Sequence, residues 1–203
     1  MRFDFADLAD LPTKEGQKTK EGQKTQGAQK ISVHGLDTKL GEMVAGFTDK
    51  GLCLLEFSQR NNLKAQLGLL AKQLNGYFVH EKGQGFDSLK AQLDAYFNGT
   101  LQNFSIPLHM VGTQTQQKIW NILQEIPYGE TWSYKQEAVR YGNPKATQAV
   151  GGANGKNKIA IIIPCHRVIG ADGGLTGYAG GIERKQALLQ LENANLATNL
   201  AMA

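Results

Sequence analysis

Two apolar runs in the first half of the chain constrain the fold most. They lie within EMVAGFTDKGLCLLEF, which begins at Glu42, and they are joined at Asp49-Lys50-Gly51. Two apolar segments that are separated by a short turn containing Asp and Gly are typical of a β-hairpin. Cys53 falls in the second strand between leucines, and we interpret it as a small core residue.

Helical periodicity follows the predicted hairpin in two places. The first helix is indicated by Leu63, Leu67, Leu70 and Leu74, and the second by Leu89, Leu93 and Phe97. The second helix is predicted to run from Asp87 to Gly99. The chain before the hairpin is different, since residues 12–30 contain a tandem copy of KEGQKT and no large apolar side chain. We therefore predict a disordered tail over residues 1–30 and a small N-terminal α/β domain over residues 31–108.

The second half of the chain is predicted to be mainly helical. After a linker strand at 106–108, Thr113 and Gln116 form a capping-box signal for a helix that ends at Pro127-Tyr128-Gly129. A short helix from Ser133 to Tyr141 stops at Gly142, and Asn143-Pro144 is expected to start another that runs to about Asn154. Two short helices joined by a tight turn indicate a helix-turn-helix. The fold class is thus α+β, with a C-terminal domain over residues 109–196 and a flexible end over 197–203.

Charge and composition limit the classes of function that this protein can have. Residues 135–158 carry five basic side chains against Glu137 alone, so the positive charge gathers near the predicted helix-turn-helix. This block fits either a solvated face or a surface that meets phosphates. No stretch approaches the roughly 18 consecutive apolar residues of a membrane span, and the N-terminus lacks the apolar core of a signal peptide. With only two cysteines, both are expected to be reduced thiols in a cytoplasmic protein.

The chemistry is concentrated directly after an apolar run. Ile159-Ala160-Ile161-Ile162-Ile163 has the pattern of a buried strand, and Pro164-Cys165-His166-Arg167-Val168 follows at once. An imidazole and a nearby cation lower the pKa of a thiol from about 8.5 and raise its thiolate fraction. Cys165 is therefore the candidate nucleophile.

At these residues the sequence resembles the methylated-DNA–protein-cysteine methyltransferases, also called O6-alkylguanine-DNA alkyltransferases. The resemblance covers about residues 35–193, and its most specific element is the run from Ile163 to Val168. Further matching motifs are Pro127-Tyr128-Gly129-Glu130-Thr131, Ser133-Tyr134, Asn143-Pro144-Lys145-Ala146, Ala149-Val150-Gly151-Gly152, Asn154, Asn157 and Gly177-Tyr178-Ala179-Gly180-Gly181.

The resemblance implies a role for each catalytic position. Cys165 would accept the alkyl group, and His166 would deprotonate it through a water. Glu192 would orient the imidazole, as in a hydrolase triad. Asn157 would brace the turn that carries the active-site strand, and Tyr134 would hydrogen-bond the flipped guanine. The product is a thioether, which water does not readily cleave, so one protein should repair one lesion. The expected lesions are O6-alkylguanine and O4-alkylthymine. The resemblance also implies that the domain over residues 31–108 is ribonuclease-H-like.

The resemblance also implies that the partner is double-stranded DNA with O6-alkylguanine, with the second helix of the helix-turn-helix in the minor groove. The residues expected on the substrate or DNA side are Lys145, Ala146, Gln148, Ala149, Gly151, Arg167, Val168, Tyr178 and Ala179. Backbone groups of Cys165, Val168 and Ala179 would read the edge of the guanine. Gln148 departs from the arginine usual at its position, and Ala179 stands where some members have serine.

The sequence also bears on metals, cofactors, oligomeric state and alternative functions. We expect no metal, because the N-terminal half offers only Cys53, His34, His80 and His109. We also expect no cofactor and a monomer. Three other function classes remain: a sensor that binds alkylated bases without chemistry, a cysteine hydrolase and a transcription regulator. Cys165 argues against the first, the helix-turn-helix is unexplained by the second, and the third lacks a ligand or partner domain.

Overall fold

The computed structural model describes residues 27–192 and divides into two compact units. Unit 1 includes the chain up to Ala91 together with Ile106–Val111, and unit 2 includes Gln92–Ser105 and the chain from Gly112 onward. Most of the predicted N-terminal tail and the predicted flexible C-terminus lie outside the described residues. No described helix is long and apolar enough to cross a membrane.

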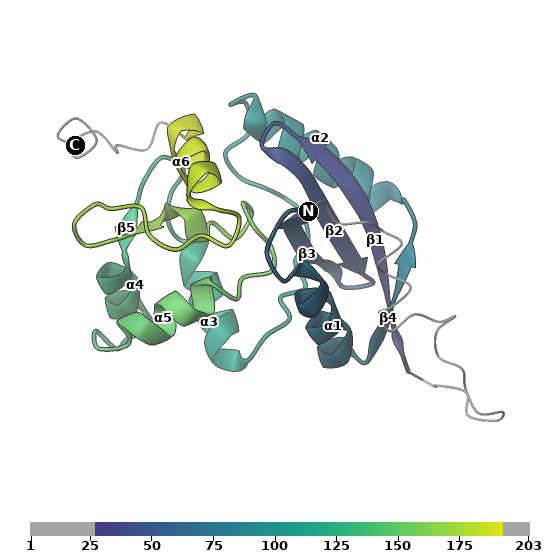
Figure 1. Cartoon of the computed structure of the whole chain (residues 1–203), viewed down its shortest axis with the longest axis horizontal. Coiled ribbons are helices and arrows are strands. Elements are labelled where there is room, and N and C mark those ends of the chain that lie inside the picture. Colours follow the sequence, from purple (N-terminus) through teal and green to yellow (C-terminus); the bar gives the residue numbers. More distant parts are fainter. Residues whose placement is uncertain (1–26, 193–203) are drawn as a thin grey trace. The chain divides into compact units, whose positions relative to one another are not determined.

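Unit 1 is built on a four-stranded mixed sheet with the order β3-β2-β1-β4 (Figure 1). Its strands are β1 Gln29–Thr38, β2 Gly41–Thr48, β3 Gly51–Phe57 and β4 Gly76–His80. The predicted hairpin is confirmed as the antiparallel pair of β2 and β3. The sequence interpretation missed β1, which begins at Gln29 and includes the last two residues of the predicted tail. Strand β1 also pairs in parallel with β4, which forms one edge of the sheet.

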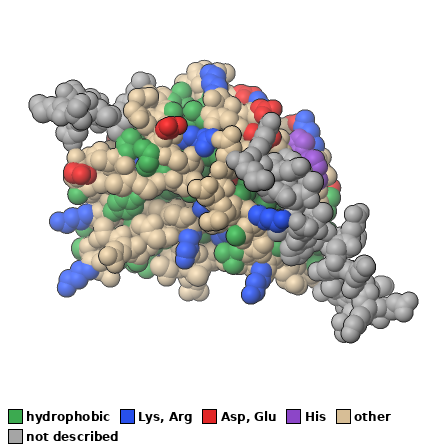
Figure 2. Space-filling view, in the orientation of Figure 1, with side chains coloured by type: hydrophobic (Ala, Val, Ile, Leu, Met, Phe, Trp, Pro, Cys, Tyr) green, Lys and Arg blue, Asp and Glu red, His purple; other side chains and the backbone are tan. Residues whose placement is uncertain are grey.

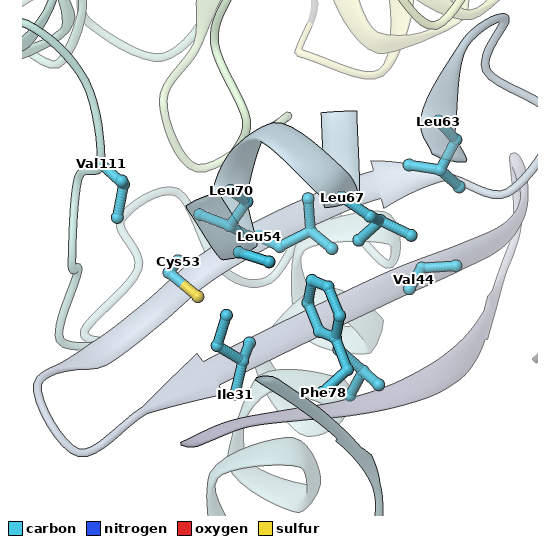
Figure 3. Close-up of a cluster of buried hydrophobic side chains, with 11 residues drawn as sticks. Ile31, Val44, Cys53, Leu54, Leu63, Leu67, Leu70, Phe78 and Val111 are labelled. Atoms are coloured by element: carbon cyan, nitrogen blue, oxygen red, sulfur yellow. The ribbon is translucent and has the colours of Figure 1, made fainter. Parts of the chain in front are cut away.

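Two helices accompany this sheet. Helix α1 spans Leu63–Leu74 as predicted, and α2 spans Gln84–Phe97, beginning three residues before the predicted Asp87. Apolar side chains of α1 pack with those of the sheet, and Cys53 lies among them with its thiol donating to the Gly46 carbonyl at 3.3 Å (Figure 3). The expectation that Cys53 is a core residue is confirmed. The predicted strand at 106–108 is wrong, since only Leu108 forms an isolated bridge, with Leu52.

Unit 2 is mostly helical after the end of α2. Its elements are α3 Gln114–Leu123, β5 Trp132–Ser133, α4 Tyr134–Tyr141, α5 Thr147–Asn154, η2 Cys165–Arg167, β6 Val168–Ile169 and α6 Ile182–Leu191. The two short strands pair in parallel. Thr113 and Gln116 form the predicted capping box, and Gly142 ends α4 with a φ of 94°. The predicted α+β class is confirmed, with a helix-turn-helix formed by α4 and α5.

In unit 2, two helix boundaries and one predicted strand differ from the prediction. Helix α3 ends at Leu123, before Pro127, because the next residues form turns. Helix α5 begins at Thr147, since the Asn143 side chain accepts from the Lys145 N–H and the Asn143 carbonyl accepts from the Ala146 N–H, which makes residues 143–146 a turn. Residues 159–163 are mostly buried but do not form a strand, because their backbone groups bond within the segment.

Candidate active site

The loop before the candidate nucleophile is held by one buried side chain. Asn157 Oδ1 accepts from the Ile159 N–H at 2.9 Å, and Asn157 Nδ2 donates to the Ile163 carbonyl at 2.8 Å. The same Nδ2 lies 3.3 Å from Cys165 Sγ. The loop includes Ile161 with a φ of 71°, a conformation that is strained for a β-branched residue. Asn157 therefore links the shape of this loop to the position of the sulfur.

Cys165 begins a single 3₁₀ turn, and the two residues after it point into the interior. His166 is fully buried, and its Nε2 lies 2.9 Å from Glu192 Oε1. Burial lowers the pKa of His166 against the opposing pull of Glu192, so the ring is neutral near pH 7. Its Nδ1 has no hydrogen-bond partner within residues 27–192. With Nε2 donating to the carboxylate, Nδ1 holds a lone pair that can accept a proton.

Glu192 is paired with a buried cation as well as with the imidazole. Arg167 donates through Nε to Oε2 at 2.9 Å and through Nη2 to Oε1 at 3.0 Å, and its Nη1 donates to the Ile126 carbonyl at 2.6 Å. Burial alone would raise the pKa of Glu192, but the hydrogen bonds and charges of His166 and Arg167 lower it to about 2. The carboxylate is therefore ionised throughout the neutral range.

The Pro127-Tyr128-Gly129 segment contacts the C-terminal end of α6, where Glu192 is the capping residue. Tyr128 donates its hydroxyl to the Leu191 carbonyl at 3.2 Å, and the Gly129 N–H lies 3.4 Å from Glu192 Oε2. Gly129 has a φ of 80°, and a Cβ there would lie 2.9 Å from the Glu192 carbonyl oxygen. Only glycine fits this close approach. From the sequence this motif is predicted to end a helix, whereas in the structure it contacts the residues that carry the carboxylate of the site.

A small cavity of about 290 Å³ opens beside Cys165. Its lining residues are Tyr134, Gly151, Asn154, Gly155, Cys165, Gly177, Tyr178 and Ala179. Five of them were predicted as site residues: Tyr134, Gly151, Cys165, Tyr178 and Ala179. A Cβ at Gly151 would lie 3.5 Å from the Tyr134 ring, so this glycine adds no side chain to the cavity beside that ring. Burial raises the pKa of Tyr134, which keeps its hydroxyl protonated and able to donate.

Helix α5 presents small and uncharged side chains to solvent. Gln148 and Ala149 are exposed, Ala146 and Gly151 are half-buried, and Lys145 is exposed in the turn before the helix. Lysine and arginine side chains are scattered over the face seen in Figure 2 and do not form one dense patch there. Of the five basic residues in the predicted block, Lys158 is buried with its Nζ over the Trp120 ring, so it is not part of a solvent-facing basic surface.

Two residues expected on the substrate or DNA side lie elsewhere. Arg167 is only 7% exposed, and its guanidinium is directed to Glu192 and Ile126. This corrects its expected role, because the charge is needed to balance a buried carboxylate. Val168 is fully buried and is not among the residues that line the cavity. Its N–H donates to the Cys165 carbonyl, and its own carbonyl accepts from Lys185 Nζ at 2.5 Å.

Several buried polar residues near the site escaped the sequence interpretation. Lys185 is fully buried, and burial lowers its pKa to about 8. Glu137 is also fully buried on α4 and accepts from Asn154 Nδ2 at 2.7 Å, behind the cavity wall. Burial raises the pKa of Glu137 to about 7, against this hydrogen bond. Tyr96, on α2, reaches the same carboxylate as His166. A polar residue on the apolar side of a helix was the one available signal for Glu137 and Tyr96.

Two family models match successive parts of this chain. Residues 33–110 match the family model described as 6-O-methylguanine DNA methyltransferase, ribonuclease-like domain. Residues 114–194 match the model described as 6-O-methylguanine DNA methyltransferase, DNA binding domain. The chain belongs to the methylated-DNA–protein-cysteine methyltransferase family. The resemblance identified from the motifs is therefore confirmed, and the two models together cover most of the described residues.

Curated relatives and solved structures lead to the same family. The methylated-DNA–protein-cysteine methyltransferase of Methanosarcina barkeri is 44% identical over 161 residues, which cover 79% of this chain and 96% of the relative. That of Mycobacterium leprae is 41% identical over 172 residues, which cover 85% and 98%. The crystal structure of Mycobacterium tuberculosis OGT in complex with DNA is similar with a TM-score of 0.67 and 41% identity, over 81% of this chain and 92% of that one.

Proposed function

We propose that this chain repairs DNA by transferring the alkyl group of O6-methylguanine to its own Cys165. The observation that carries the proposal is the placement of Cys165 at a small cavity, next in sequence to a buried His166 that is bonded to Glu192. Family membership supplies the reaction, alkyl transfer from O6-methylguanine in DNA to a cysteine of the protein, and this geometry supplies the acceptor.

The proposed reaction is a displacement at the alkyl carbon. His166 takes the thiol proton through a water, and the bond from Cys165 Sγ to the alkyl carbon forms as the bond from that carbon to O6 breaks. The electron pair of the broken bond stays on the guanine oxygen. Tyr134, which lines the cavity, donates a hydrogen bond to that oxygen, and the proton lost by the thiol ends on the guanine.

The protein groups around the thiol have separate tasks in this scheme. Glu192 holds the His166 ring in the tautomer that leaves Nδ1 free to accept. Asn157 fixes the loop and places an amide N–H near the developing thiolate. Tyr178 and Ala179 line the cavity, where backbone groups of Cys165 and Ala179 would read the base; those of Val168, expected to do so as well, are bonded to Cys165 and Lys185. The thioether product resists water, so each chain reacts once, with no cofactor or metal in the scheme. Within residues 27–192 no cluster of three metal-binding side chains exists.

DNA binding is proposed to take place through α5. Its small side chains at Ala146, Ala149 and Gly151 suit close approach to a minor groove, with Lys145 near the phosphates. The alkylated guanine must be rotated out of the duplex, at a cost of a few kcal/mol, to reach the cavity. Gln148 would occupy the vacated space. We also propose O4-alkylthymine as a second substrate, a monomeric state and a cytoplasmic location.

Intact-mass measurement tests the proposal directly. Incubation with excess duplex DNA containing O6-methylguanine should add the mass of one methyl group per chain, located by peptide mapping at Cys165, and the reaction should then stop. Sustained turnover would contradict the single-use scheme. Binding to the damaged duplex without any mass change would favour the alternative, a sensor of alkylated bases.

Exchange of Gln148 for arginine should speed repair of duplex DNA. Glutamine can hydrogen-bond in the vacated stack, but it lacks the positive charge that the negative potential of the minor groove attracts. A free alkylated base bypasses extrusion, so the rate with free O6-benzylguanine should remain nearly unchanged in Gln148→Arg. Single-turnover rates of both proteins with both substrates decide the matter. Slower duplex repair, or parallel changes in the two rates, would show that Gln148 does not act in extrusion.

A further inference from the structure

Tyr96 connects the last turns of α2 to the candidate active site. Its side chain is fully buried, and its hydroxyl donates to Glu192 Oε1 at 2.6 Å. The ring contacts Phe97, Phe104 and Tyr128 at centroid distances between 5.3 and 6.1 Å. Tyr96 belongs to the stretch matched by the ribonuclease-like model, whereas the other residues of the site lie in the DNA-binding match. A residue outside the catalytic motifs thus touches the carboxylate of the site.

The hydroxyl shares one carboxylate oxygen with two other donors. Glu192 Oε1 accepts from Tyr96, and it also lies 2.9 Å from His166 Nε2 and 3.0 Å from Arg167 Nη2. The tyrosine contact is the shortest of the three. Hydrogen bonds to a carboxylate are charge-assisted, and each added donor draws negative charge toward itself. The pull of this oxygen on a protonated imidazole is therefore weaker than that of a carboxylate bonded to histidine alone.

We propose that Tyr96 is a positioning residue for the transfer reaction: its hydroxyl orients Glu192 and limits the pull of that carboxylate on His166, so that the imidazole is available as a base. The inference rests on the proposed function of Cys165 and His166. On this proposal, a residue that precedes the DNA-binding match contributes to the transfer reaction. Tyr96 acts through Glu192.

The surroundings of His166 support this assignment. The charged and polar groups that face the imidazole are Glu192, Arg167, Lys185 and Tyr178. Burial lowers the pKa of His166, the carboxylate opposes that effect, and the cations of Arg167 and Lys185 reinforce it. Burial and the nearby Glu192 raise the pKa of Tyr96, so its hydroxyl stays protonated at every pH at which the protein would be assayed.

Removal of the hydroxyl should shift the pH dependence of the reaction. In Tyr96→Phe, Glu192 Oε1 loses a donor and stabilises the imidazolium more strongly. The pH below which the single-turnover rate with free O6-benzylguanine falls should rise by about one unit, the order expected for loss of one strong hydrogen bond to a carboxylate. A purely structural role would lower the rate by the same factor at every pH. Tyr96→Met removes the same hydroxyl with a different side-chain shape and should move the profile in the same direction.

Tyr128→Phe is the matched control. It removes a hydroxyl from the same ring cluster, but that hydroxyl bonds the Leu191 carbonyl and not the Glu192 side chain. Its profile should keep the wild-type position on the pH axis. Titration of the His166 ring by NMR, in the folded proteins without substrate, should show the same upward shift in Tyr96→Phe alone. This measurement does not depend on alkyl transfer, so failure of the proposed function would be seen separately.

Two outcomes would overturn the inference. One is a wild-type His166 titration in both Tyr96 variants, and the other is an equal shift in Tyr128→Phe. A raised midpoint confined to the Tyr96 variants would support it.

Discussion

Replacement of Cys165 by alanine should abolish alkyl transfer and leave the fold intact. The sulfur is the only proposed acceptor, and the other thiol, Cys53, is fully buried in the sheet of unit 1. Cys165 is only partly buried, so the loss of its sulfur should change the free energy of unfolding by no more than about 1 kcal/mol. Intact mass after incubation with a duplex containing O6-methylguanine should equal the starting mass, and the variant should still bind that duplex.

Cys53→Ala provides the control for thiol chemistry. It removes a core thiol that donates to the Gly46 carbonyl, so some stability should be lost, but one alkyl group per chain should still be transferred. Continued alkylation of the Cys165→Ala protein, or loss of alkylation in folded Cys53→Ala protein, would place the acceptor elsewhere.

Conversion of Glu192 to glutamine should destabilise the protein strongly. The substitution keeps the shape of the side chain but leaves the buried Arg167 cation without its counter-charge. Loss of one partner of a buried ion pair costs about 3–5 kcal/mol, and we expect a decrease of that size in the free energy of unfolding. Urea unfolding at pH 7 measures it. The transfer rate should fall as well, because His166 loses the carboxylate that orients it.

The double variant Arg167→Met/Glu192→Gln separates charge from packing. With both charges removed, it should recover part of the stability that Glu192→Gln alone loses. The pH dependence gives a second check. The pKa of Glu192 is lowered from 4.5 to about 2 on folding, so its contribution to stability is fully present above about pH 4.5 and is lost as the pH falls toward 2. Glu192→Gln should lack this part of the acid transition. A decrease below about 1 kcal/mol at pH 7 would show that the pair is unimportant.

The parts of the fold that depend on local sequence could be predicted. The β2–β3 hairpin, the capping box at Thr113 and the end of α4 at Gly142 each follow from a few adjacent residues. The segment 159–163 shows the limit of such reasoning. Its apolar side chains correctly indicate burial, but they do not determine the backbone, which is held in turns by the side chain of Asn157. Strand β1 pairs with the adjacent β2 as well as with the distant β4, and it was missed because its sequence, QKISVHGLDT, has few apolar residues and includes a glycine.

The candidate site likewise contains some features that the local sequence indicates and others that it does not. Cys165 and His166 are neighbours in the chain, and their chemistry is visible from that adjacency. The bond from His166 to Glu192 spans 26 positions and could be expected only from the family resemblance. The bond from Tyr96 to Glu192 spans 96 positions, and no local pattern indicates it. Arg167 was misplaced because an arginine beside a nucleophile suits either a phosphate or a buried carboxylate, and only the fold decides between them.

The membership of Gln92–Ser105 in unit 2 has a practical consequence for anyone who would use this protein as a self-labelling tag. A tag cut to the DNA-binding match would start at 114 and would discard the tyrosine that bonds the reactive centre, together with the aromatic ring of Phe104 beside it. The shortest useful tag therefore has to include Gln92–Ser105, even though this also adds Ile106–Val111, which belongs to unit 1.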